Sequence, residues 1–356
     1  MADILANSPS KGQITAIPVE PISVDAEQVR DWRQTLKNAI ETVEALLTAV
    51  QVPVSALPER LQAQADFALR VPRPFVARMG KGDPDDPLLK QVLPAPEELQ
   101  TAPGYSHDPL DEQDTEIPGL LHKYRSRVLL ITTGACAINC RYCFRRHFPY
   151  DDNRMGRKGF AAIADYIARH PEVNEVILSG GDPLAAPDSY LAELHATLAA
   201  LPQLKRFRIH TRLPIVIPER VNDELLGWLA SPRFQTVVVI HSNHPNEIDA
   251  EVAAAMQRLR DAGITLLNQA VLLAGINDSA PVLAELSEKL FACGVLPYYL
   301  NQLDQVHGAS HFAVPDERAR AIVRELLPLL PGFLVPRLTR EEAGKTSKTP
   351  LDLQLG

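Results

Sequence analysis

Apolar runs and helical segments alternate regularly along the chain after Arg127. Six short apolar runs predict β-strands, at residues 128–133, 175–179, 206–211, 236–241, 265–269 and 296–300. Segments with helical periodicity follow them, at residues 160–170, 189–201, 223–230, 249–262, 280–293 and 315–330. Six strand–helix units in succession predict a parallel sheet with helices outside it, and a final strand is expected at 333–338. Because the strands are almost continuously apolar, we expect both faces of the sheet to be buried.

The chain before these units has a different pattern. Residues 1–25 contain scattered proline and serine with little periodicity and are expected to form a loose arm. Helical periodicity begins near Asp25 and continues to Val50, and a second helical block, interrupted by prolines, is expected at 61–79. Residues 80–120 are rich in Asp, Pro and Gly and are expected to wrap the surface. We therefore divide the chain into an N-terminal arm and helical region at 1–122, a strand–helix region at 123–338 and a tail at 339–356.

Polar side chains collect where the predicted strands end. These ends carry Gly-Gly-Asp at 180–182, His-Thr-Arg at 210–212, His-Ser-Asn-His at 241–244, Asn-Gln at 268–269 and Asn-Gln-Leu-Asp at 301–304. An open doubly wound sheet would fit the number of units equally well. Chemistry gathered at one ring of strand ends, however, is typical of barrel enzymes. We therefore predict an α/β fold, a partial (β/α)6 barrel with an N-terminal helical region and a short C-terminal tail.

The composition narrows the class of protein. The chain has 356 residues, 46% hydrophobic and 22% charged, which is ordinary for a soluble globular protein. A net charge of −8 argues against a general nucleic-acid or anionic-membrane binder. Neither a signal peptide nor an apolar run long enough to span a membrane is visible. Clustered cysteines in such a chain indicate a reducing, cytoplasmic compartment and a metal role, while the separate Cys293 reads as a small buried residue near a helix end.

Three of the four cysteines, Cys136, Cys140 and Cys143, form a C-x3-C-x2-C motif just after the first predicted strand. An ordinary [4Fe–4S] cluster is held by four thiolates, so three thiolates leave one iron open to a further ligand. A second interpretation stays open at this point. His147 follows the motif closely and would complete a Cys3His zinc site.

Gly180, Gly181 and Asp182 end the second predicted strand. Glycines let the backbone approach a ligand closely and an aspartate can engage an amine, although glycine pairs at strand ends more often form tight turns. Placed one unit after a three-cysteine loop, the motif resembles the glycine motif of the radical S-adenosylmethionine (SAM) enzymes. This resemblance implies that the three cysteines hold a [4Fe–4S] cluster whose open iron binds SAM. It also implies that residues 180–182 contact SAM.

From Lys123 to Pro350 the chain further resembles the lysine 2,3-aminomutases. The similar stretches are residues 127–131, 140–146, 178–182, 244–247, 268–273, 275–278 and 297–299. Those enzymes carry a pyridoxal phosphate (PLP) lysine in a Lys-Thr-Pro context, which Lys348 matches here. Lys345 also precedes a threonine but lacks the proline. Without the resemblance, the tail would be read as a frayed end with solvated lysines.

The resemblance assigns four more residues. Arg145 corresponds to the arginine that holds the substrate carboxylate, a task that suits its planar guanidinium. Asp304 and Glu341 correspond to two acidic positions that hold the ε-ammonium of lysine through charge-assisted hydrogen bonds. Arg127 corresponds to an arginine near the PLP phosphate; by itself it would read as an ordinary charge at a strand edge.

The chain also departs from that family. Glu341 replaces an aspartate, and Asn301 replaces a tyrosine near PLP. The fermentative members continue past the PLP lysine with a cysteine-bearing zinc segment, whereas this sequence stops at Gly356, so we expect no such zinc site. The short tail instead resembles the bacterial branch that supplies (R)-β-lysine for modifying elongation factor P.

We therefore expect an isomerase that converts (S)-α-lysine into (R)-β-lysine. The resemblance implies that the reduced cluster splits SAM into a 5′-deoxyadenosyl radical and that PLP lets the nitrogen migrate from C2 to C3. Expected partners are free L-lysine, an electron donor of the reduced flavodoxin or ferredoxin type and, functionally, the elongation factor P lysyl ligase. Nucleic acid and membranes are not expected, and a homo-oligomer is left open. The rivals are a stand-alone aminomutase for catabolism or osmoprotection, and a zinc-binding structural or regulatory protein.

Overall fold

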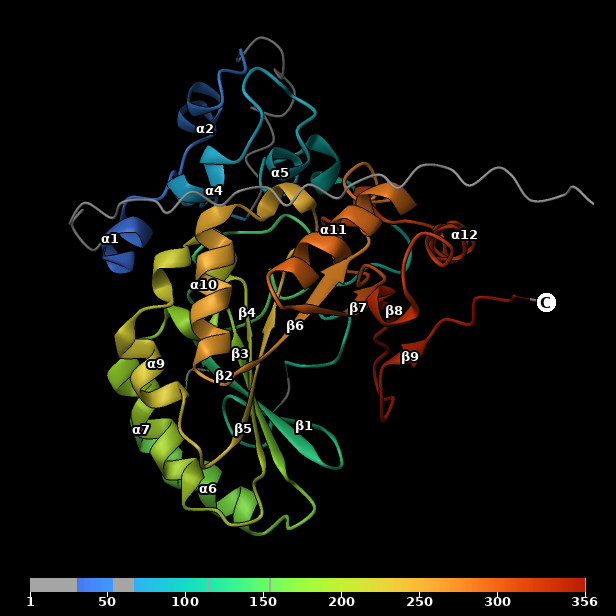
Figure 1. The fold of residues 1–356 in the computed structure, drawn as a ribbon. Coiled ribbons are helices and arrows are strands. Elements are labelled where there is room, and N and C mark those ends of the chain that lie inside the picture. Colours follow the sequence, from blue (N-terminus) through green and yellow to red (C-terminus); the bar gives the residue numbers. More distant parts are fainter. Residues whose placement is uncertain (1–30, 54–66, 114, 154, 356) are drawn as a thin grey trace, which may run out of the picture. The chain divides into compact units, whose positions relative to one another are not determined.

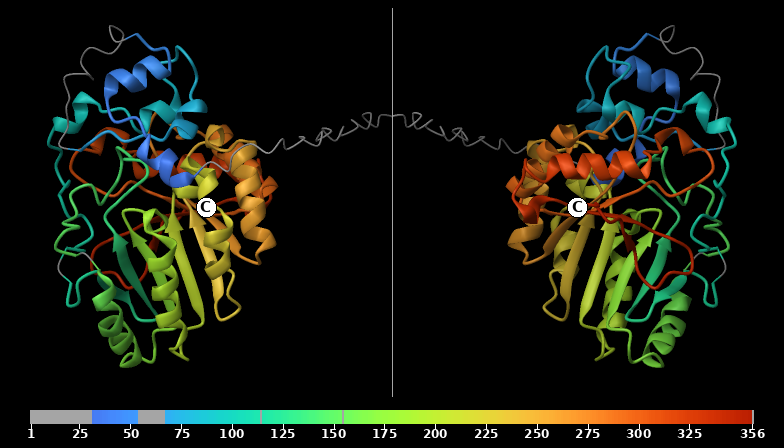
Figure 2. Two further views of the ribbon diagram at one scale, coloured as in Figure 1. Left: turned by 90° about the vertical axis from the view of Figure 1, so that its left-hand side faces the viewer. Right: turned by 90° about the vertical axis from the view of Figure 1, so that its right-hand side faces the viewer.

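One sheet organises the chain (Figure 1; Figure 2). The structure, a computed structural model, describes residues 31–53, 67–113, 115–153 and 155–355. In this part of the chain nine strands lie side by side in sequence order. Short edge strands, β1 (Leu120–Tyr124) and β9 (Thr349–Pro350), pair antiparallel with their neighbours. The strands between them are parallel: β2 (Arg127–Thr133), β3 (Glu175–Gly180), β4 (Arg206–Thr211), β5 (Gln235–Ile240), β6 (Thr265–Val271), β7 (Leu296–Asn301) and β8 (Arg337–Arg340).

Helices connect the parallel strands and cover the outer side of the sheet (Figure 1). Just before α10 (Ala250–Asp261), Asp249 accepts a hydrogen bond from the backbone N–H of Val252 at 2.9 Å and so caps the helix. Its buried residues recur at three- and four-residue steps, and the helix ends just before Gly263, whose φ is +77°. The connecting helices are α6 (Phe160–Ala168), α7 (Asp188–Ala199), α8 (Leu213–Val216), α9 (Asp223–Leu229), α10 (Ala250–Asp261), α11 (Ala280–Ala292) and α12 (Asp316–Leu326). The predicted partial barrel of strand–helix units is therefore confirmed.

The two faces of the sheet carry different residues. In β4, Phe207 is fully buried and packs edge-on against Trp228 of α9. Arg206, Arg208 and His210 alternate with the apolar residues of the same strand and line a cavity on the inner face. We expected both faces of the sheet to be buried, but the residues of β4 on the inner face are only half-buried. A partly open barrel leaves that face to a cavity, where polar side chains remain accessible to a ligand.

The N-terminal region is helical in short pieces instead of two long blocks. Between α1 (Trp32–Lys37) and α2 (Val43–Ala49), Ile40 forms a β-bridge with Val71. The described part of the second block contains only α4 (Arg73–Ala77), which carries a proline in its first turn, where proline is tolerated. The predicted arm at 1–25 and residues 61–66 lie outside the described residues. The hydrophobic core of the sheet extends into this region through Trp32, Leu46, Phe75 and others.

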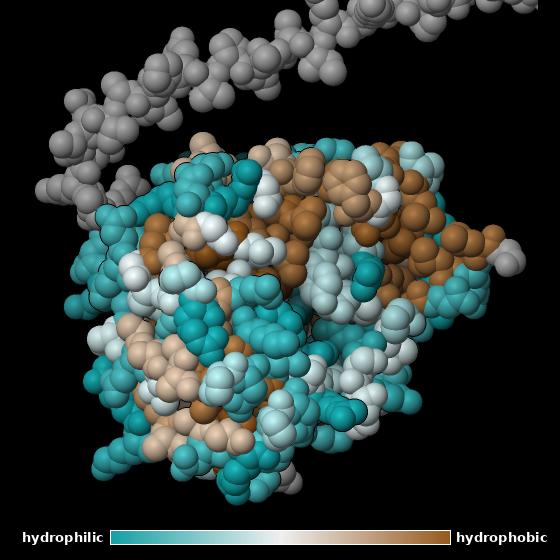
Figure 3. Space-filling view, turned by 60° about the horizontal axis from the view of Figure 1, so that its bottom comes forward, coloured by the Kyte–Doolittle hydropathy of each residue, from teal (hydrophilic) through white to brown (hydrophobic). Residues whose placement is uncertain are grey.

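The edges of the sheet differ most from the prediction. Neither β1 nor β9 was expected, because β1 has only two apolar residues and β9 has two residues in all. Strand β8 begins at Arg337, later than the expected 333, because Gly332–Leu334 forms a 3-10 turn. A short helix, α5 (Pro87–Lys90), and the 3-10 turn η2 (Pro96–Leu99) lie within the 80–120 segment. No helix in the described residues is long and apolar enough to cross a membrane. Figure 3 shows one face of the molecule, on which hydrophilic and hydrophobic residues are interspersed.

Candidate active site

A cavity of about 630 Å³ lies on the inner face of the sheet. It is lined by side chains from β2 to β7, by the loops that follow these strands and by the tail. Every residue that the sequence assigned to the site lines this one cavity: Arg127, Cys136, Cys140, Cys143, Arg145, Gly180, Gly181, Asp182, Asp304, Glu341 and Lys348. The fold therefore brings together the cysteine loop, the strand ends and the C-terminal tail.

The three cysteines lie in the loop after β2, close enough for each charge to affect the others. Burial and the neighbouring thiolates raise the pKa of Cys143 to about 11 and the pKa of Cys136 well above its usual range. The guanidinium of Arg212 donates a hydrogen bond to Sγ of Cys140 at 2.7 Å. Buried thiols such as these become thiolates when they bind a metal centre, because the metal displaces their protons. Three cysteines at one cavity wall fit a [4Fe–4S] cluster with one iron left open.

His147 does not join these cysteines. Its ring stacks on that of His107 with centroids 4.3 Å apart, and its Nε2 lies 3.2 Å from the carbonyl oxygen of His307. The cysteines line the cavity, whereas His147 is not among the residues that line it. The Cys3His zinc site that the sequence left open is therefore not assembled in the described part of the chain.

The two glycines hold the cysteine loop tightly against β3. Gly180 has a φ of +130°, and a Cβ there would lie 2.4 Å from the carbonyl oxygen of Thr133. A Cβ on Gly181 would lie 2.5 Å from the carbonyl oxygen of Ala135. The backbone N–H groups of Gly181 and Asp182 donate to the same two carbonyls at 2.7 and 2.8 Å. Any larger side chain would push the cysteine loop away, so the pair positions the loop as well as bordering the cavity.

The carboxylate of Asp182 is fully engaged by the protein itself. It accepts hydrogen bonds from Thr211 Oγ1 at 2.6 Å, from the backbone N–H of Arg212 at 2.8 Å and from that of Leu184 at 3.0 Å. It therefore fixes the end of β4, which carries Arg212. These contacts give Asp182 a positioning role toward Cys140 through Arg212; the predicted contact between Asp182 and SAM stays a prediction.

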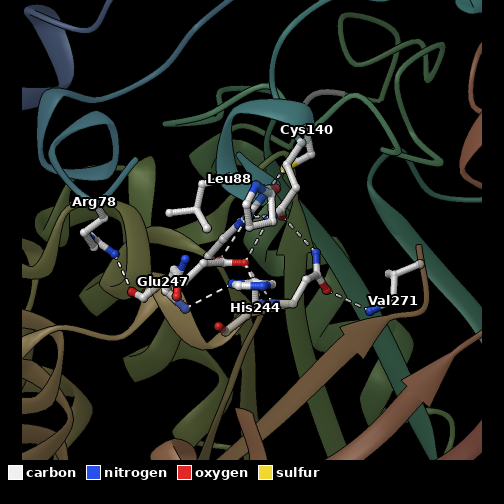
Figure 4. Close-up of polar contacts among 12 residues, drawn as sticks. Arg78, Leu88, Cys140, His244, Glu247 and Val271 are labelled. Carbon is white, nitrogen blue, oxygen red and sulfur yellow. Dashed lines mark hydrogen bonds and ion pairs between the residues drawn. The ribbon is translucent and has the colours of Figure 1, made fainter. Parts of the chain in front are cut away.

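A buried network extends from Cys140 to Glu247 (Figure 4). Arg212 donates to Glu247 at 3.0 Å and to Gln91 Oε1 at 2.6 Å. The other oxygen of Glu247 accepts from Gln91 and from the backbone N–H groups of Asn243 and His244. Because Glu247 and Gln91 are completely buried, this network fixes the guanidinium beside the thiol. Our prediction did not single out either residue: Glu247 stood only within the family-like stretch 244–247, and Gln91 had no signal.

Arg145 is buried and already has a partner. Its Nε donates to Glu112 at 2.7 Å and one terminal nitrogen donates to Ser179 Oγ at 2.9 Å. Glu112 also forms an ion pair with Lys123 at 2.8 Å. Burial alone would lower the pKa of Arg145, but the charge of Glu112 raises it above its usual range. The guanidinium is thus permanently charged and held in place. Sequence reasoning missed Glu112, which lies in the aperiodic 80–120 segment.

Lys348, Glu341 and Asp304 meet at the other end of the cavity. Nζ of Lys348 lies 2.7 Å from Glu341 and 5.8 Å from the ring centre of Tyr299. Burial would raise the pKa of Glu341, but the ammonium of Lys348 holds it below its usual range. Burial raises the pKa of Asp304 to about 7. The negative charge of Glu341 acts in the same direction, whereas the positive charge of Lys348 acts to lower the pKa. Lys345, the alternative lysine, is exposed and does not line the cavity.

Two further histidines line the cavity with a ring nitrogen that lacks a partner among the described residues. His210 and His241 line it, and burial lowers the pKa of His241 to about 4 and that of His210 well below its usual range. Both rings are therefore neutral, and Nε2 of each is buried without a hydrogen-bond partner among the described residues. Such orphaned groups are costly unless a bound molecule satisfies them. The sequence placed both residues at strand ends but gave them no role.

Arg127 and Asn301 occupy the remaining walls. The guanidinium of Arg127 lies over the ring of Tyr124 at 4.2 Å. Asn301 donates to the carbonyl of Ala270 at 3.3 Å and accepts from Thr339 Oγ1 at 3.0 Å, so it joins β6, β7 and β8. The asparagine that departs from the family pattern therefore stabilises the sheet beneath the cavity.

Comparison with known proteins identifies the family of the chain. Residues 130–286 match the radical SAM superfamily. The chain is 50% identical to L-lysine 2,3-aminomutase of Escherichia coli over 335 residues, 94% of this chain and 98% of that protein. It is 50% identical to the Haemophilus influenzae enzyme over 94% of this chain and 98% of that protein. It is 38% identical to the Clostridium subterminale enzyme over 90% of this chain and 77% of that protein.

Among solved structures the similarity is weaker. Native anSMEcpe with bound AdoMet and a Cp18Cys peptide superposes with a TM-score of 0.44 and 12% identity, over 65% of this chain and 75% of that chain. The family assignment depends on the sequence relatives, which align along nearly the whole chain. The chain therefore belongs to the radical SAM L-lysine 2,3-aminomutase family, isomerases whose cofactors are a [4Fe–4S] cluster, SAM and PLP.

Proposed function

We propose that this chain converts (S)-α-lysine into (R)-β-lysine by moving the amino group from C2 to C3. The observation that carries the proposal is the grouping of Lys348 with two carboxylates, Glu341 and Asp304, in the cavity that holds the three cysteines. A lysine for PLP and an acidic pocket for an ammonium are both needed for a lysine-specific PLP enzyme. The names of the relatives point to the same substrate.

Free lysine has a carboxylate and an α-ammonium at one end and an ε-ammonium at the other. The cavity has charged side chains that could bind the carboxylate and the ε-ammonium. Arg145 is rigidly held and permanently charged, which suits binding of the substrate carboxylate. Asp304 and Glu341 suit the distant ε-ammonium, because two carboxylates around one ammonium favour lysine over shorter or neutral amino acids. The α-amine would then lie between these ends, near the middle of the cavity.

We assign the attachment of PLP to Lys348. In the structure, the ammonium of Lys348 neutralises Glu341 at 2.7 Å. With Lys348 holding PLP, Glu341 would keep its contacts with Tyr124 at 3.1 Å and Lys123 at 3.7 Å and would offer its other oxygen to the ε-ammonium of the substrate. When bound, the cluster and SAM supply a radical that takes hydrogen from the substrate, and PLP carries the migrating nitrogen. The task of the chain is to orient these groups and to exclude water from them.

The decisive experiment follows the nitrogen atom. The protein would be reconstituted anaerobically with iron, sulfide and PLP, reduced, and incubated with SAM and lysine labelled with 15N at the α-amine. We expect the label on C3 of β-lysine, detected by NMR. Cleavage of SAM without β-lysine would contradict the proposed substrate, and a colourless protein that holds zinc and no iron would contradict the radical chemistry altogether.

We further propose that the product serves the modification of elongation factor P, in the cytoplasm, where a reducing environment preserves the cluster. The support is the sequence around Lys348, Ser-Lys-Thr-Pro-Leu-Asp-Leu at 347–353, which resembles that bacterial branch. In a strain that lacks this chain, elongation factor P should lose the mass of one β-lysyl group and regain it when β-lysine is added. An unchanged mass would favour the rival role in catabolism or osmoprotection.

A further inference from the structure

Three histidines from separate parts of the chain meet outside the cavity. His107 lies in the segment before β1, His147 follows the cysteine loop and His307 lies between β7 and α12. One ring nitrogen or other ligand atom of each lies within 4.8 Å of those of the other two. Within the described residues, this is the one group of His, Cys, Asp and Glu side chains whose ligand atoms are close enough to share a single metal ion. None of the three lines the active-site cavity.

The backbone around these histidines is a built framework. Ser106 forms a parallel β-bridge with Val306, and the N–H of His307 donates to the carbonyl of Ser106 at 2.8 Å. Arg146 donates to the carbonyl of Gly308 at 3.1 Å, which joins the cysteine segment to the same loop. Arg146 is itself paired with Glu98 at 2.8 Å, so its positive charge beside the histidines is partly neutralised. The three rings are thus presented by segments that are already fixed to one another.

A contact with a backbone carbonyl fixes the tautomer of His147. A carbonyl oxygen can only accept, so the 3.2 Å contact with His307 requires the proton of His147 on Nε2. This tautomer leaves the lone pair of Nδ1 free. Metal-binding histidines commonly donate their other ring N–H to a carbonyl in this way, which fixes both tautomer and orientation.

We propose that His107, His147 and His307 form a site for a divalent transition-metal ion, Zn2+ in particular, separate from the cysteine cluster. Imidazole nitrogens suit this class of ion, and three of them leave a fourth, tetrahedral position for water. Zn–N bonds of about 2.0–2.1 Å place two tetrahedral ligands roughly 3.4 Å apart, so the ligand atoms, now within 4.8 Å of one another, must move closer. The ring of His107, which stacks on that of His147, must also turn so that both lone pairs point at one ion. His107 is exposed and free to make most of this movement.

The ion would fasten the loop that carries Asp304 to the segment that carries the cysteines. His307 is three residues after Asp304, and His147 is four residues after Cys143. A bond between the two histidines through one ion would restrict motion between these two sides of the cavity. The site is therefore structural, and its occupancy can be measured without any assay of lysine turnover.

The test uses the full-length protein with its cysteines occupied by the iron–sulfur cluster. After anaerobic exposure to Zn2+ and removal of unbound metal, iron and zinc are measured together. We expect about one zinc per chain in addition to the cluster iron. His307→Gln and His107→Gln should weaken zinc binding about tenfold or more while iron content stays unchanged. His170→Gln, at a half-buried histidine outside this group, is the matched control and should retain the zinc.

Hydrogen exchange provides a second readout that a misfolded variant cannot imitate. In the parent protein, Zn2+ should slow backbone exchange at residues 105–108 and 305–309, and this protection should disappear in His307→Gln. Zinc retained equally by all variants would overturn the proposal. Zinc that binds only when the cluster is missing would overturn it too, because the ion would then occupy the cysteines.

Discussion

The two ends of the cavity are built in opposite ways. At the cysteine end, Arg212 and Glu247 form an ion pair whose side chains are 6% and 0% exposed, inside a network of further hydrogen bonds. At the lysine end, Lys348 and Glu341 form an ion pair in which both side chains are 19% exposed. All but Glu247 line the same cavity, but the first pair is almost inaccessible to water, whereas the second is partly exposed.

This difference matches what each end must do. A guanidinium that supports a cluster ligand should keep one position through every turnover, and burial with several partners ensures this. In the proposed function, Lys348 gives up its ion pair with Glu341 when it binds PLP. A more exposed ion pair costs less free energy to separate. Substitutions at the lysine end should therefore change chemistry and binding, whereas substitutions at the cysteine end should change stability.

The largest expected effect is the loss of Lys348. Lys348→Ala should reduce lysine turnover on the order of 10⁴-fold or more, the size of effect seen when a covalent catalytic group is removed. Borohydride reduction followed by mass spectrometry should find no PLP on the chain, while iron content remains normal. Lys345→Ala is the control, because Lys345 is exposed and outside the cavity, and it should keep both PLP and activity. Trapping of PLP on the Lys348→Ala chain would contradict the assignment.

Next in size is the buried pair at the cysteine end. Glu247→Gln leaves Arg212 buried without its counter-charge, which should lower the free energy of unfolding by about 3 kcal/mol. Glu224→Gln removes a carboxylate from an ion pair with Arg33 that is about half exposed, and it should cost less than about 1 kcal/mol. Urea unfolding of both variants in the same metal-free state measures the difference. Equal losses would mean that the network contributes no more than a surface pair.

The cysteine end also shows what sequence can and cannot reveal. The strand–helix alternation predicted the parallel sheet, because buried strands and amphipathic helices each leave a periodic trace. It did not predict the polar inner face. In β4, Arg206, Arg208 and His210 alternate with apolar residues, but so short a run was read as apolar throughout. Gln91 and Glu112 were missed for a different reason. They lie in an aperiodic segment, and only tertiary packing brings them to Arg212 and Arg145.

The residues assigned by family resemblance form a separate case. All of them line one cavity, yet their roles are only partly visible in its geometry. Asp182 is engaged by Thr211 and by backbone N–H groups, and Arg145 is engaged by Glu112 and Ser179. A local motif identifies which residue types are present, whereas the partner of each side chain depends on contacts across the whole fold.

A third prediction concerns the acidic pocket. Asp304→Asn should raise KM for lysine about 10- to 100-fold, because a charge-assisted hydrogen bond contributes roughly 1.5–3 kcal/mol. Binding of SAM and iron content should not change, since Asp304 lies at the lysine end. An unchanged KM would remove Asp304 from the substrate site.

The same carboxyl makes stability depend on pH. Burial raises the pKa of Asp304 from an ordinary 3.8 to about 7, so between these values the folded chain holds a proton that the unfolded chain has lost. Stability therefore falls as pH rises through this range. Asp304→Asn removes this loss, so its melting temperature relative to the parent chain should be higher at pH 8 than at pH 5. A constant difference between the two pH values would contradict the raised pKa.

The smallest expected effect comes from a substitution that keeps the charge at position 341 but shortens the side chain. Glu341→Asp keeps the carboxylate and restores the residue type of the resembled family, but it shortens the side chain by one methylene. Glu341 now touches both Lys348 at 2.7 Å and Tyr124 Oη at 3.1 Å, and a shorter side chain cannot keep both contacts. We expect KM for lysine to change only about two- to fivefold, less than one charge-assisted hydrogen bond. A loss as large as that of Asp304→Asn would show that position, more than charge, governs recognition at the lysine end.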